Sequence, residues 1–173
     1  MLGIFCRFIH LINILNKLEF LKRINTKLIL THCLAGFLLI FASSIIGYIN
    51  DIELATFVEK NGVNEAMKQL GAERLSNYTI WFYISPLIGL LVSTLISSFI
   101  ILKKKLLWIN STLVFLGLLF LNFLNLYRLE YTKYVVYLMN YGLVINVVIF
   151  SSIFMLLSFV SYYYSFRIKK NEN

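Results

Sequence analysis

The sequence predicts an all-α integral membrane protein with four transmembrane helices. Its 173 residues are 60% hydrophobic and only 14% charged, whereas a soluble domain is nearer half apolar and a quarter charged. The apolar residues cluster into runs of about twenty or more, the length that a helix needs to cross the hydrocarbon core. Basic residues flank these runs, so we interpret the net charge of +8 as contact with the membrane surface and not with nucleic acid.

The three consecutive lysines Lys103, Lys104 and Lys105 determine the predicted topology. They separate two apolar runs and cannot lie in hydrocarbon, and positive loops are retained on the cytoplasmic side. We therefore predict that this loop and both termini are cytoplasmic. The inner segments then contain eleven of the 16 basic residues: Arg7, Lys17, Lys22, Arg23, Lys27, Lys103, Lys104, Lys105, Arg167, Lys169 and Lys170. The outer segments contain the others: Lys60, Lys68, Arg74, Arg128 and Lys133.

Residues 1–27 are rich in apolar side chains, but polar residues interrupt them too often for a transmembrane span or the core of a secretory signal. We predict an interfacial amphipathic helix on the cytoplasmic leaflet, anchored by Lys17, Lys22, Arg23 and Lys27. The alternative interpretation is that the native chain starts further downstream.

The first predicted span, residues 28–48, carries no charge. Ser43 and Gly47 are four residues apart, so they share a face and permit close contact with another helix. His32 lies near the cytoplasmic end of this span. We expect a hydrogen-bonded or snorkelling imidazole and no haem, because the other histidine, His10, lies outside the spans.

Residues 50–77 form the predicted outer loop, with two short helices. Asn50 followed by Glu53 is typical of a helix start. Asn61 and Gly62 indicate a helix stop, and apolar residues at helical spacing before Gly71 indicate a second amphipathic helix. Helices this short bury little area, so we expect them to pack on the membrane surface or on a partner.

The second predicted span, residues 78–102, contains a row of small residues at intervals of four. This small-xxx-small pattern lets helix backbones approach closely in a membrane, so it predicts a helix-packing face. The residues of the row are Ser85, Gly89, Ser93 and Ser97.

The third and fourth predicted spans, residues 106–127 and 134–164, are joined by a short outer loop, so they should be antiparallel neighbours. A basic cytoplasmic tail, residues 165–173, follows. Polar amides in lipid usually turn inward and bond across helices, which is our expectation for the asparagines of these spans. The alternative is that they line a path for a solute. The four asparagines are Asn122, Asn125, Asn140 and Asn146.

The sequence contains no catalytic, metal-binding or cofactor motif, and no predicted span contains the carboxylate that proton-coupled exporters usually need. We therefore expect no enzyme and no cofactor.

The leading hypothesis is a structural or accessory subunit of a membrane complex, associating through the small-residue faces and the outer loop. Its partners would be the lipid bilayer and other membrane subunits or a second copy. The alternative is a small-solute transporter or channel that uses the amides. Frequent Ile, Lys, Asn, Phe and Tyr suggest an AT-rich bacterial genome, and we expect the protein in the cytoplasmic (inner) membrane of a bacterium.

Overall fold

The computed structural model describes residues 24–106, 108–124 and 129–167, and within these ranges every regular element is helical. Three helices are long and apolar enough to cross a membrane, and a fourth apolar helix is shorter, which indicates a multi-pass membrane protein. The elements are α3 (Thr26–Ile46), the 3-10 turn η1 (Gly47–Ile49), α4 (Ile52–Asn61), α5 (Val63–Leu70), α6 (Ala72–Lys103), α7 (Ile109–Phe123), α8 (Leu129–Val136) and α9 (Leu143–Arg167).

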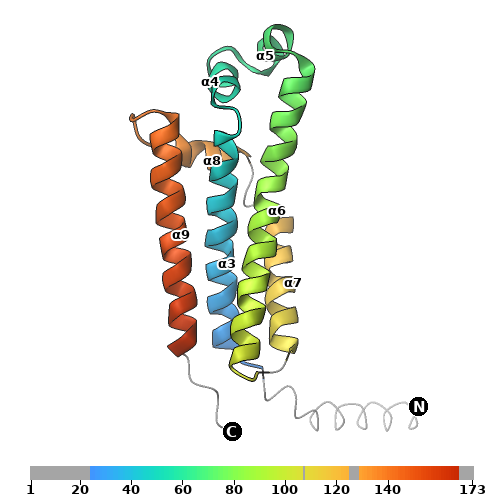
Figure 1. The fold of residues 1–173 in the computed structure, drawn as a ribbon, viewed down its shortest axis with the longest axis vertical. Helices are drawn as coiled ribbons and strands as arrows, with labels where there is room; N and C mark the ends of the chain where they lie inside the picture. The colour runs from blue at the N-terminus through green and yellow to red at the C-terminus, as the bar shows by residue number, and fades with distance from the viewer. Residues whose placement is uncertain (1–23, 107, 125–128, 168–173) are drawn as a thin grey trace, which may run out of the picture.

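Helix α3 is the centre of the bundle. It packs on α9, α6 and α7, and α6 also packs on α7. Figure 1 shows α4, α5 and α8 together at one end, which we call the hairpin end. The start of α3, the turn between α6 and α7, and the last residue of α9 lie at the opposite end, which we call the lysine end.

The outward faces of the long helices carry large apolar side chains. Leu95 and Phe99 on α6, and Leu156 and Phe159 on α9, all expose more than half of their surface. A continuous apolar surface of this kind is typical of contact with lipid or with another protein, not with water.

The predicted fourth span, residues 134–164, is divided in the structure. Helix α8 ends at Val136 and α9 begins at Leu143. Gly142 has a φ of 91°, a left-handed conformation that an α-helix does not contain. The sequence offered no charge at this point, so the apolar run resembled one continuous helix.

The third predicted span, residues 106–127, corresponds to α7, whose described helix has 15 residues. At about 1.5 Å per residue it is about 22 Å long, less than the hydrocarbon core of about 30 Å. The predicted interfacial segment, residues 1–27, lies outside the described residues except at its end, where Thr26 and Lys27 begin α3.

The outer segment contains the two expected short helices, with one correction. The residue that caps α4 is Asp51 and not Asn50, because the Asp51 carboxylate accepts a hydrogen bond of 3.0 Å from the Leu54 amide. Gly62 and Gly71 separate α4, α5 and α6 with φ values of 83° and 89°. We refer to residues 52–70 as the α4–α5 hairpin.

Candidate functional site

The structure brings four of the predicted packing residues together where α3 crosses α6. A Cβ atom added at Gly89 would lie 2.8 Å from the Cα of Ile40 and 3.0 Å from the Cβ of Ser43. One added at Gly47 would lie 3.1 Å from the Oγ of Ser85. At Gly89 the two backbones therefore approach so closely that a side chain would force them apart, whereas at Gly47 the near neighbour is the Ser85 side chain and the nearest backbone atom, the Cα of Phe82, is 3.7 Å away.

The other two residues of the row, Ser93 and Ser97, belong to a buried polar cluster further toward the lysine end. The Tyr162 hydroxyl of α9 donates to the Ser93 carbonyl at 3.2 Å, and the Ser97 hydroxyl donates to the Tyr162 oxygen at 3.4 Å. The Ser158 hydroxyl donates to the Ala35 carbonyl of α3 at 2.8 Å. Hydrogen bonds therefore connect α9 to both α6 and α3.

His32 lies inside this cluster and is 0% exposed. Its ring meets the Tyr162 ring edge to face, with centroids 5.5 Å apart. Neither ring nitrogen has a hydrogen-bond partner within the described part of the chain, so our expectation of a hydrogen-bonded or snorkelling imidazole was wrong. The reason is that the hydroxyl of Tyr162 is directed to the Ser93 carbonyl, which leaves only its aromatic ring against His32.

Among the intramembrane asparagines, Asn146 is buried and acts locally. Its side-chain amide donates to the Val136 carbonyl at 2.7 Å and to the Met139 carbonyl at 2.5 Å. These bonds cap the end of α8 and hold the turn that leads into α9. We expected the amide of Asn146 to bond across two spanning helices, but both of its bonds go to the end of α8 and the turn after it.

The other predicted asparagines that the structure describes do not share the burial of Asn146. Asn140 is exposed, and Asn122 is half-buried on α7. Asn125 lies outside the described residues. The described amides are therefore not gathered into one polar site.

Two asparagines that the sequence analysis did not single out connect α3 to α7. Asn110 is fully buried, and its side-chain oxygen accepts a hydrogen bond of 3.0 Å from the Asn25 amide. The Asn25 side chain in turn caps α3 by accepting from the Leu28 amide. Asparagine directly before an apolar run is a helix-start pattern, so Asn25 had a recognisable signal, whereas Asn110 had none.

The three lysines that we used to assign topology form the turn after α6. Lys103 is the last residue of that helix, and Lys105 has a φ of 55°. The Lys104 ammonium donates to the Ser165 carbonyl at 2.5 Å, and the Lys103 ammonium lies 5.9 Å from the Phe166 ring. The turn is thus attached to the end of α9.

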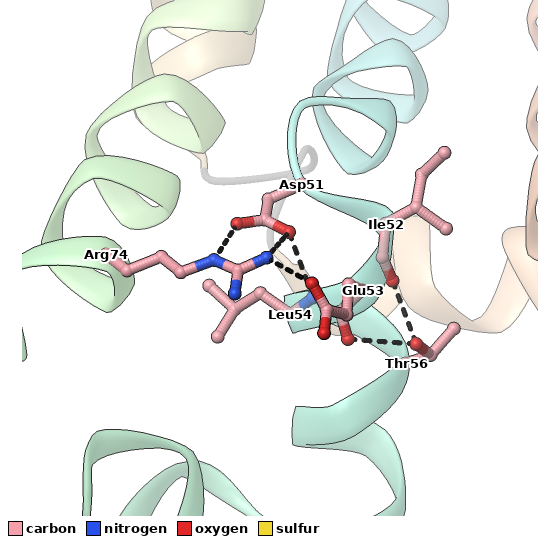
Figure 2. Close-up of polar contacts among 6 residues, drawn as sticks. All are labelled: Asp51, Ile52, Glu53, Leu54, Thr56 and Arg74. Carbon is pink, nitrogen blue, oxygen red and sulfur yellow. Dashed lines mark hydrogen bonds and ion pairs between the residues drawn. The ribbon is translucent and has the colours of Figure 1, made fainter. Parts of the chain in front are cut away.

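A cluster of charges fixes the base of the α4–α5 hairpin, as Figure 2 shows. The Arg74 guanidinium on α6 donates to both carboxylate oxygens of Asp51, at 2.6 and 2.8 Å, and to Glu53 at 2.8 Å. A planar guanidinium matches a carboxylate with two parallel bonds, which fixes geometry as well as charge. The hydrogen bond from Arg74 holds the pKa of Asp51 below its ordinary value. The first turns of α4 and α6 are therefore joined.

An open hollow of about 480 Å³ lies beside this charge cluster. Its lining includes Asn50, Asn77 and Tyr78 as well as Asp51 and Arg74. Arg74 and Asp51 are paired with each other, so they stabilise the wall of the hollow.

Within the described residues no three His, Cys, Asp or Glu side chains are grouped as metal ligands would be. No family model matches the sequence, and comparisons with curated proteins and with solved structures find no match either. What the fold defines is therefore a class, a helical multi-pass membrane protein.

Proposed function

We propose that this chain is a non-enzymatic accessory or structural subunit of a membrane protein complex, and that it contacts its partner through the apolar face of α5. The observation that supports this proposal is the exposure of that face. Val63 is 55% exposed and Met67 is 48% exposed, one turn apart on the same side of α5. Exposed apolar side chains on a short amphipathic helix are typical of a contact surface.

The length of α6 argues that this face meets a protein and not lipid. Helix α6 has 32 residues and is about 48 Å long at about 1.5 Å per residue. The hydrocarbon core is about 30 Å thick, and headgroups add about 7 Å on each side. Because the lysines that end α6 cannot enter hydrocarbon, its first residues project about 18 Å beyond the core at the hairpin end. Helix α5, which precedes Ala72, would then lie in water.

The hairpin is also held in a fixed position, which favours binding. Arg74 joins α4 to α6, and Leu54, Ala55 and Ala66 are buried beneath the two short helices. A surface that is already ordered loses less conformational entropy when a partner binds. The α4–α5 hairpin is therefore suited to recognition.

The other contact route that the sequence suggested, the small-residue faces, is used inside the chain. Gly47 and Gly89 pack between α3 and α6, and Ser93 is fully buried, so none of them is presented to a partner. The alternative function, a solute path along the amides, draws support from none of the described contacts. We therefore place the partner contact at α5.

We further propose a topology with four spans, of which α7 is the short third one, in the cytoplasmic membrane of a bacterium. The lysine end would be cytoplasmic, with the α4–α5 hairpin outside. In a chain with Cys6→Ser and Cys33→Ser, an impermeant maleimide applied to intact cells should label Lys60→Cys, an exposed position on α4 away from the α5 face, but not Lys105→Cys. Labelling of Lys105→Cys before the membrane is permeabilised would reject this topology.

The docking proposal can be tested with a photo-reactive amino acid placed at Met67 in native membranes. We expect a discrete protein adduct from position 67 and none from position 68, an exposed neighbour that points about 100° away around α5. Val63→Glu/Met67→Glu should reduce co-purification of the same partner about ten-fold, because a buried apolar contact of about 1.4 kcal/mol is lost. Thermal stability should not change, since both side chains are exposed.

Two results would contradict the docking proposal. One is equal adducts from positions 67 and 68. The other is undiminished recovery of the partner with Val63→Glu/Met67→Glu. A matched control is Lys68→Glu, which also adds a negative charge to α5 but leaves the apolar face intact.

A further inference from the structure

One side of the central helix is open in the half of the bundle nearest the lysine end. Helices α7 and α9 flank α3 on different sides. Within the described residues each of them packs on α3, but α7 and α9 do not pack extensively on each other. Between them, Leu30 is 65% exposed and Leu34 is 55% exposed. Lys27, Leu30 and Leu34 follow one another at intervals of three and four, so they form one stripe along α3. We call them, with the half-buried Phe37, the α3 stripe.

The stripe is closed toward the hairpin end. Phe41 is buried, with its ring 4.9 Å from that of Phe154 on α9. Helix α8 packs on both α3 and α9, and its Val136 is buried. The open length therefore runs from Lys27 to about Phe37, which is about 15 Å along the helix axis.

This length selects between possible occupants. A transmembrane helix from a partner would need about 30 Å of open surface, whereas one leaflet of the hydrocarbon core is about 15 Å thick. The α3 stripe matches the reach of a lipid acyl chain in the leaflet at the lysine end. A spanning helix would collide with α8.

The charge at the end of the stripe selects the headgroup. Lys27 is exposed, and its ammonium lies 6.0 Å from the Tyr164 ring. The ion pairs of the described residues all involve Arg74 at the hairpin end, so no described carboxylate neutralises Lys27. The first turn of α3 also carries the positive end of its helix dipole, which favours an anion there.

We propose that the α3 stripe binds an anionic phospholipid, with its headgroup at Lys27 and one acyl chain on Leu30 and Leu34. The site is distinct from the α5 surface and does not depend on it. It requires only that α3 crosses the membrane with Lys27 at the interface. Bound lipid would cover a part of the central helix that the described residues leave open.

Fluorescence quenching by brominated lipids tests the site in the full-length chain. The native tryptophans are removed as Trp81→Phe and Trp108→Phe, and Leu34→Trp introduces a reporter into the stripe. Leu95→Trp, on the exposed face of α6 and at a similar distance from the lysine end, is the matched control. The probes are vesicles of phosphatidylcholine with dibrominated phosphatidylglycerol or dibrominated phosphatidylcholine at the same mole fraction.

We expect the Leu34→Trp indole to report about a five-fold preference for phosphatidylglycerol over phosphatidylcholine, as one lysine near the surface provides. Lys27→Gln should abolish this preference at position 34, whereas quenching of Leu95→Trp, which lies on the helix that ends at Lys103, should not respond to Lys27→Gln. If Leu34→Trp does not fold, Leu30→Trp reports on the same stripe.

Three outcomes would overturn the proposal. Equal quenching by both lipids in the stripe would indicate ordinary boundary lipid. A preference that survives Lys27→Gln would place the headgroup elsewhere. Absence of quenching by either lipid would show that residues 1–23 or another protein covers the stripe.

Discussion

Gly89→Ala is expected to lower the free energy of unfolding by about 1–3 kcal/mol, the usual effect of overpacking a well-packed interior. The added Cβ would lie 2.8 Å from the Cα of Ile40, a backbone atom that cannot rotate away. Helices α3 and α6 would have to separate and lose van der Waals contact along their crossing. Gly89→Leu should have a larger effect, because it adds three more carbons at the same place. Unfolding in mixed detergent micelles, followed by circular dichroism, measures the change.

Gly117→Ala is the matched control for this experiment. The Cβ added at Gly117 would also have a neighbour at 2.8 Å, but that neighbour is the Sγ of Cys33, a half-buried side chain that can move. Both substitutions gain about 1 kcal/mol of helix propensity, so the difference between the two variants isolates the contact with the backbone. Equal stability of the two variants would show that the α3–α6 crossing is not tightly packed.

Asn146→Leu is expected to destabilise the protein by about 1–3 kcal/mol, because the Val136 carbonyl would lose a donor in a buried place and the Met139 carbonyl would lose one in a partly buried place. The loss should be local at first, with the turn between α8 and α9 opening before the bundle unfolds. Hydrogen exchange at residues 132–146, compared with exchange in α3, would detect this order.

Asn140→Leu is the control for this second prediction. Asn140 lies in the same turn but is exposed, so its replacement should change stability by less than about 0.5 kcal/mol. If Asn146→Leu were as stable as Asn140→Leu, the capping role would be excluded and the amide would be available for a solute.

The class of protein and the existence of most helices were predictable because their causes are local. In hydrocarbon every backbone amide must bond within its own segment, so an apolar run of sufficient length predicts a helix. Charges that cannot enter lipid mark the ends, as the lysines after α6 do. Gly62 and Gly71 stop helices through their own backbone conformation, whatever surrounds them.

The parts that the sequence did not predict depend on residues far apart in the chain. Asn25 and Asn110 are separated by 85 positions, and Ser158 and Ala35 by 123. Some asparagines are buried and accept a hydrogen bond from a distant backbone amide, and others face lipid. No local sequence pattern distinguishes the two cases. The environment of His32 could not be predicted from local sequence for the same reason. The division of the fourth apolar run into α8 and α9 also depends on tertiary contacts. The Asn146 side chain on α9 bonds to the end of α8 and stabilises the turn between them. Apolar composition alone does not reveal this turn. Composition and charge therefore determined that this chain is helical and enters a membrane, while the pairing of buried polar groups was decided only by the packing of α3 against its neighbours.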